Sequence, residues 1–124
     1  MKTVLAIVGS QEMEALLQRA LRKKYALTVC RSVEEGADLL LYKPDALILE
    51  LCLPGCDGLS FLQQNRSMLP PVVLALSVLV SRAVLEAASH AGVGGLILIP
   101  CTGNEVVRQL DALMRKKDPS LSGG

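Results

Sequence analysis

The chain has 124 residues, of which 51% are hydrophobic and 20% are charged, with a formal net charge of +1. That length supports one domain with a sizeable core, and the near balance of charge predicts no strong attraction to nucleic acid or to an anionic membrane. Two basic runs, residues 22–24 and 115–117, end predicted helices, where cations complement the helix dipole. No apolar run reaches the ~20 residues that span a bilayer. Nothing before Gly9 is typical of a secretory signal, so we expect a cytoplasmic protein with reduced thiols.

Short apolar runs alternate with amphipathic stretches along the first half of the chain. Residues 3–8 predict a first strand, and Ser10 is a predicted N-cap for a helix with apolar residues at helical spacing. Residues 26–30 predict the second strand, and Ser32 begins a capping box that opens the second helix. Residues 45–50 form an apolar run without alternation, which is typical of a central parallel strand covered on both faces.

The same alternation continues in the second half. Residues 59–66 predict a short helix, and residues 72–77 predict the fourth strand. A helix follows from Ser81 to about residue 91, and residues 96–99 predict the fifth strand. A capping box from Thr102 to Glu105 opens the last helix.

This order of elements predicts the fold class. Five strand–helix pairs predict an α/β, flavodoxin-like, doubly wound (βα)5 three-layer sandwich, with a parallel five-stranded sheet in the order 2-1-3-4-5. We expect the domain to cover residues 1–117 and residues 118–124 to be a polar tail or the start of a linker.

Residues 43–58 and 91–100 carry the most specific patterns in the chain. The first stretch contains Pro-Asp, four apolar residues, Glu50, then Leu-Cys, and then Leu-Pro-Gly-Cys-Asp-Gly. Together the two stretches resemble the receiver domain of bacterial response regulators, the CheY-like superfamily, over about residues 1–117. In that family the third strand ends in an aspartate that accepts a phosphoryl group, and here the position holds Glu50.

The resemblance also implies which residues stand at the family's other reactive positions. Gly9 and Ser10 occupy the place of the acidic pair that holds Mg²⁺, and Ser77 occupies the place of the hydroxyl. Ile99 stands at the place of the family's lysine, and Leu96 stands at the place of its switch aromatic residue. Pro100 is the equivalent loop proline and a candidate for a cis peptide bond. Because phosphoryl transfer depends on positioning and electrostatic stabilisation, we expect no metal, no cofactor, no catalytic residue and no enzymatic activity.

Several readings of these residues remain open. Glu50 is either a built-in mimic of the phosphorylated state or a drifted residue on a structural scaffold. Ser77 either hydrogen-bonds Glu50 or satisfies the strand end, and Asp57 is read as a turn residue rather than a substitute acceptor. Two other functions stay possible alternatives: a small-molecule sensor at the crevice lined by Gly9, Ser10 and Glu50, or a residual phospho-switch.

The four cysteines do not predict a shared metal site. Cys30 and Cys101 follow strands at opposite edges of the predicted sheet, which places them roughly 19 Å apart. Cys52 and Cys56 could pair under oxidation, although packing of small side chains is the simpler reading.

The resemblance implies a role in protein–protein contact. Family members associate through a face that here spans residues 81–117, and its candidate exposed contacts are Arg82, Glu86, Asn104, Arg108 and Asp111. We therefore expect a phosphorylation-independent interaction module of a bacterial two-component signalling or transcription regulator. Its partner would be a second copy or another protein, with a possible output domain after Gly124, and with no direct binding of nucleic acid or membrane by this domain.

Overall fold

The structure is a computed structural model that describes residues 1–53 and 55–117 and leaves the side chain of Cys56 undescribed. The expected tail or linker, residues 118–124, therefore lies outside the described residues.

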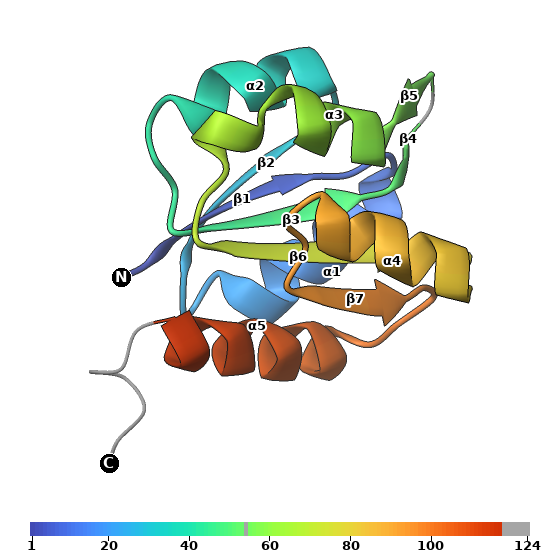
Figure 1. Cartoon of the computed structure of the whole chain (residues 1–124). Helices are drawn as coiled ribbons and strands as arrows, with labels where there is room; N and C mark the ends of the chain where they lie inside the picture. Colours follow the sequence, from blue (N-terminus) through green and yellow to red (C-terminus); the bar gives the residue numbers. More distant parts are fainter. Residues whose placement is uncertain (54, 118–124) are drawn as a thin grey trace.

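A parallel sheet of five strands forms the centre of the domain (Figure 1). The strands are β1 (Thr3–Ile7), β2 (Ala26–Cys30), β3 (Ala46–Glu50), β6 (Val72–Ser77) and β7 (Gly95–Leu98). They lie in the order β2-β1-β3-β6-β7, which confirms the predicted order 2-1-3-4-5.

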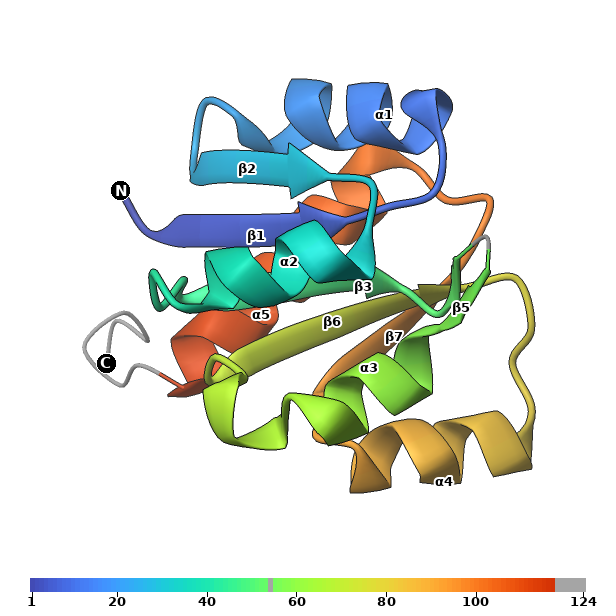
Figure 2. The ribbon, with the colours of Figure 1, turned by 90° about the horizontal axis from the view of Figure 1, so that it is seen from above.

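Helices cover both faces of this sheet, as Figures 1 and 2 show. One face carries α1 (Gln11–Leu21) and α5 (Gly103–Lys117), and the other carries α2 (Val33–Leu40), α3 (Gly58–Gln64) and α4 (Arg82–His90). A 3-10 turn, η1 (Arg66–Met68), follows α3. The three-layer sandwich predicted from the sequence is confirmed.

The central strands explain why the sheet is the core. Every residue of β6 is buried, and β3 is buried up to Glu50, which is half-buried. Alternate residues of each strand point to opposite faces, so Ile48 packs toward α1 and α5 while Leu47 and Leu49 pack toward α2 and α3. Two hydrophobic clusters result, one on each side of the sheet.

Helix starts follow local capping chemistry. The Ser10 hydroxyl accepts the Met13 N–H at 3.1 Å, and the Ser32 and Ser81 hydroxyls accept equivalent N–H groups at 3.1 and 3.2 Å. Thr102 and Glu105 form the reciprocal capping box, because each side chain accepts the other's backbone N–H, at 3.1 and 3.3 Å. The predicted N-caps and the Thr102–Glu105 box are confirmed, whereas within the described residues Ser32 caps α2 without a reciprocal hydrogen bond to the Glu35 side chain.

One small element was not predicted. Residues of β4 (Cys52–Leu53) pair antiparallel with β5 (Cys56–Asp57), between β3 and α3. Two-residue strands are too short to produce a periodic pattern, so the sequence gives no signal for them.

Candidate functional site

The candidate site lies at the carboxyl end of the sheet, where β1, β3 and β6 end side by side. Glu50 is the last residue of β3 and pairs in register with Leu76, so Ser77 follows on the neighbouring strand. Gly9 follows β1 on the other side, and its N–H donates to Glu50 Oε1 at 3.0 Å. The carboxylate therefore ties the exit of β3 to the turn between β1 and α1.

Ser77 uses its hydroxyl within its own loop. The side chain is buried, with 3% exposed, and its Oγ donates to the Leu79 carbonyl at 2.7 Å. The same oxygen accepts the Leu79 N–H at 3.2 Å. Of the two readings left open by the sequence, the strand-end reading is the one these contacts favour.

Ile99 and Leu96 pack into opposite layers of the core. The Ile99 N–H donates to the Ser77 carbonyl at 2.9 Å, which places the residue beside the candidate site. Its side chain packs against the cluster under α1 and α5, whereas Leu96 packs against the cluster under α2 and α3. The Ile99–Pro100 peptide bond is cis.

Asp57 has a local structural role. It is the N-cap of α3, and its Oδ1 accepts the Leu59 N–H at 3.1 Å. The second oxygen, Oδ2, accepts the Ser60 hydroxyl at 3.1 Å. Both oxygens thus serve the first turn of α3, as the turn reading of Asp57 requires.

The donor groups at this corner do not fit a divalent cation. Mg²⁺ in proteins is bound through carboxylate oxygens, and here Glu50 is joined by Gly9, Ser10 and Ser77, which supply none. Across residues 1–53 and 55–117, no group of three or more His, Cys, Asp or Glu side chains is placed to hold a metal ion.

The cysteines are also kept apart by the fold. Burial raises the pKa of the Cys30 thiol to about 11, and the nearby charge of Glu35 acts in the same direction. Burial likewise raises the pKa of Cys101, which follows the opposite edge strand. Cys52 is exposed, and the oxidative pairing with Cys56 that the sequence left possible involves a side chain outside the described residues.

The face over residues 81–117, here called the α4–β7–α5 face, is open at the edge strand β7. Arg82, Glu86, Asn104 and Arg108 are exposed on it, as expected from the sequence. The expectation for Asp111 was wrong, because only 14% of its side chain is exposed. Asp111 instead turns toward α1 and β2, where it pairs with Lys24 and accepts the Tyr25 hydroxyl.

An apolar surface beside this face was missed by the sequence reasoning. Val78, Leu79 and Val80 follow β6 and are each at least 41% exposed, as are Leu85 on α4 and Leu98 on β7. Leu98 lies beside Ser77 in register, next to the start of the run, and Ser81 then caps α4. We call these five residues the apolar surface. Three consecutive apolar residues between a strand end and a helix cap were the available signal.

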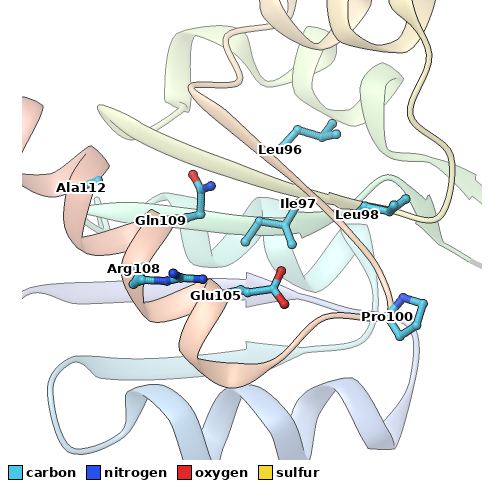
Figure 3. Close-up of a pocket in the computed structure, with 8 residues that line it drawn as sticks. All are labelled: Leu96, Ile97, Leu98, Pro100, Glu105, Arg108, Gln109 and Ala112. Carbon is cyan, nitrogen blue, oxygen red and sulfur yellow. The ribbon is translucent and has the colours of Figure 1, made fainter.

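A hollow of about 630 Å³ lies between β7 and α5 on the same face (Figure 3). Its wall on α5 carries Glu105, Arg108 and Gln109, and Ile97 points toward this helix. Leu96 and Leu98 lie on the opposite side of the strand. The apolar side chains of β7 therefore lie beside one acidic and one basic side chain of α5, Glu105 and Arg108.

Comparison with solved structures defines the class of the fold. A CheY-like response-regulator receiver domain from Methanospirillum hungatei matches with a TM-score of 0.88 and 13% identity, over 97% of this chain and 98% of the other. A two-component response regulator from Clostridium difficile matches with a TM-score of 0.87 and 18% identity, over 95% and 99%. The fold is that of a CheY-like receiver domain.

Sequence comparison points to the same class, although no protein-family model matches the chain. The probable transcriptional regulatory protein NarL of Mycobacterium tuberculosis is 31% identical over 114 residues, which are 86% of this chain and 53% of that protein. The response regulator MprA of Mycolicibacterium vanbaalenii is 29% identical over 126 residues, which are 98% and 54%. The chain is a response-regulator receiver domain, and it spans about half the length of these curated relatives. None of its described helices is long and apolar enough to cross a membrane.

Proposed function

We propose that this receiver domain acts by protein–protein contact that does not depend on phosphoryl transfer, and that its partner is a second copy of the chain. The observation that carries the proposal is the apolar surface beside the α4–β7–α5 face. NarL, one of the relatives, is named a probable transcriptional regulatory protein. The proposed role here is accordingly to bring two copies of a regulator together.

The contacts of Glu50 support independence from phosphorylation. Its Oε1 accepts the Gly9 N–H, while the Ser77 hydroxyl is hydrogen-bonded to Leu79 and the partly buried Ile99 side chain packs against the core. The groups that would position a phosphoryl group are thus used for packing and for local turns. Since such transfer depends on positioned charges, Glu50 is proposed to have a structural role, which joins β3 to the β1–α1 turn, rather than to mimic a phosphate.

The composition of the face supports self-association. Val78, Leu79 and Val80 are consecutive exposed apolar residues, and large apolar patches on a protein surface mark interaction sites. A symmetric interface brings the same surface of two copies together, so it needs groups that complement themselves. The exposed cations Arg82 and Arg108 and the exposed acid Glu86 supply both signs of charge around the apolar surface.

Light scattering coupled to size-exclusion chromatography tests the proposed dimer. We expect the wild-type domain to elute as a dimer and Leu98→Glu to elute as a monomer, because a charge would be buried at the interface. Leu41→Glu is the matched control, since Leu41 is 65% exposed and Leu98 is 55% exposed, but Leu41 follows α2, away from this face. A wild-type monomer at high micromolar concentration, or equal loss in both variants, contradicts the proposal.

Intact mass spectrometry tests the independence from phosphorylation. The domain is incubated with acetyl phosphate and Mg²⁺, and we expect its mass to remain unchanged. A stable gain of one phosphate, lost in Glu50→Gln, would show that the carboxylate still accepts a phosphoryl group.

A further inference from the structure

The amino end of the sheet, opposite Glu50, carries a strip of exposed positive charge. Both α1 and α5 run toward this end, and Figures 1 and 2 place their last turns on the side of the molecule where residue 1 lies. We define the basic strip as seven exposed side chains from the ends of these helices and from the residue before β1: Lys2, Arg22, Lys23, Lys24, Arg115, Lys116 and Lys117.

Contacts between the helices join the two basic runs into one surface. Lys24 Nζ lies 2.5 Å from Asp111 Oδ2 on α5, one helical turn before Arg115. The Tyr25 hydroxyl donates to the other oxygen of Asp111. Burial raises the pKa of Tyr25, and the bond to Asp111 and its charge add to the rise, whereas the Arg115 charge opposes it. The Arg115 guanidinium therefore lies within electrostatic reach of the residue that follows Lys24.

Lys2 extends the strip along the sheet end. It lines the same shallow hollow as Lys117, of about 170 Å³. The acids beside the strip already have partners, because Asp111 is bound as described and Asp45 Oδ2 accepts the Thr3 N–H at 2.7 Å. Within the described residues, the strip thus gathers seven cations, although the formal net charge of the chain is only +1.

Helix-dipole complementarity explains why each run is basic, but it does not remove the field that the joined runs create. Cations on one surface sum their potentials and raise the local concentration of anions. Arg22, Lys23 and Arg115 form no ion pair with any residue of the described chain, and all are exposed. Their charge is therefore available to an external anion.

The chemistry of the strip fits a phosphate backbone better than a lipid surface. Neither α1 nor α5 contributes a large exposed hydrophobic residue, although Met1, next to Lys2 in the sequence, is 81% exposed. Membrane-surface helices add a buried apolar face to their cations, whereas sequence-independent contact with nucleic acid needs cations alone. We propose that the basic strip binds the phosphate backbone of double-stranded DNA without reading its bases. This goes beyond the proposed dimerisation. It also departs from the expectation that the domain does not bind nucleic acid, which considered each basic run alone.

Fluorescence anisotropy with a labelled 20-base-pair duplex of mixed sequence tests the proposal. We expect a dissociation constant of about 1–100 µM at physiological salt, with log K falling linearly against log [salt]. The test variant Lys23→Gln/Lys116→Gln removes two strip charges, and we expect its salt slope to be shallower by about 1.8. The matched control Arg31→Gln/Arg66→Gln removes two charges outside the strip and should bind within twofold of wild type.

Each alternative outcome is distinguishable. Equal weakening in the two double variants would show that net charge, not the strip, governs binding, and would overturn the proposal. Absence of wild-type binding at 50 mM salt would overturn it as well. Tighter binding to vesicles of anionic phospholipid than to the duplex would assign the strip to a membrane surface instead. Circular dichroism of both variants checks that these exposed substitutions leave the fold intact.

Discussion

Gly58 allows a direct test of how the candidate site is held in place. It is the first residue of α3, and its N–H donates to the Leu51 carbonyl at 2.9 Å. A Cβ at this position would lie 2.8 Å from Leu51 Cα and 3.0 Å from the carbonyl oxygens of Glu50 and Leu51. These are backbone atoms, so no change of rotamer can make room for the methyl group of Gly58→Ala.

The magnitude follows from this geometry. Overpacking against a rigid neighbour costs about 1–3 kcal/mol, and alanine recovers at most ~1 kcal/mol of helix propensity. We expect the free energy of unfolding to fall by about 1–2 kcal/mol. For a domain of this size, that loss lowers the melting temperature by roughly 3–10 °C.

Thermal unfolding followed by circular dichroism measures the stability loss, and the Gly9 amide resonance in an NMR spectrum reports on the site. Because that amide donates to Glu50 Oε1, displacement of the Glu50–Leu51 segment should move its resonance. Gly55→Ala is the control: its φ of 71° disfavours alanine, but apart from its two chain neighbours no atom of the described residues lies within 4 Å of the added Cβ. That variant should lose roughly 1–2 kcal/mol without moving the Gly9 resonance. A Gly58→Ala protein with unchanged melting temperature and unchanged Gly9 resonance would refute the reasoning.

Three further predictions concern titration, pairing and metal. Because burial raises the pKa of Cys30 to about 11 from an ordinary 9.0, the folded state holds the thiol proton more tightly than the unfolded state. Its contribution is complete below pH 9 and is lost as pH rises through 11, so urea unfolding should show a loss of ~2 kcal/mol that is absent in Cys30→Ala. Asp111→Ala should cost about 1–3 kcal/mol, since the Tyr25 hydroxyl loses its charged acceptor. Lys24→Gln should cost less than ~1 kcal/mol because the Lys24 side chain is 57% exposed; equal costs would contradict this assignment. Millimolar Mg²⁺ should leave the melting temperature unchanged, and a rise would reveal a bound cation.

The helices and strands could be predicted because their signals are local. Ser10, Ser32, Ser81 and Thr102 each mark a helix start through a hydrogen bond to a residue three positions later. The apolar run before Glu50 marked a central strand because burial on both faces requires apolar residues without alternation. Right-handed connections then left few possible strand orders.

The remaining features depend on partners that are distant in sequence. Asp111 meets Lys24 and Tyr25 across 87 and 86 residues, and no pattern near Asp111 indicates that encounter. The basic strip has the same origin, because its two runs become neighbours only when α1 and α5 pack on one face of the sheet. For the Ser77 hydroxyl, the sequence left two acceptors open, and only the three-dimensional turn distinguishes them.

The Ser77 turn has a consequence for how such a domain could be controlled. Its hydroxyl holds the first residues of the following loop by two hydrogen bonds to Leu79. Under the proposed independence from phosphorylation, that loop would take its shape without an incoming phosphoryl group. The exposed residues of this loop, Val78, Leu79 and Val80, would then be available for contact as soon as the domain is folded. The amount of dimer would then be set by the concentration of the protein, that is, by its rates of synthesis and degradation.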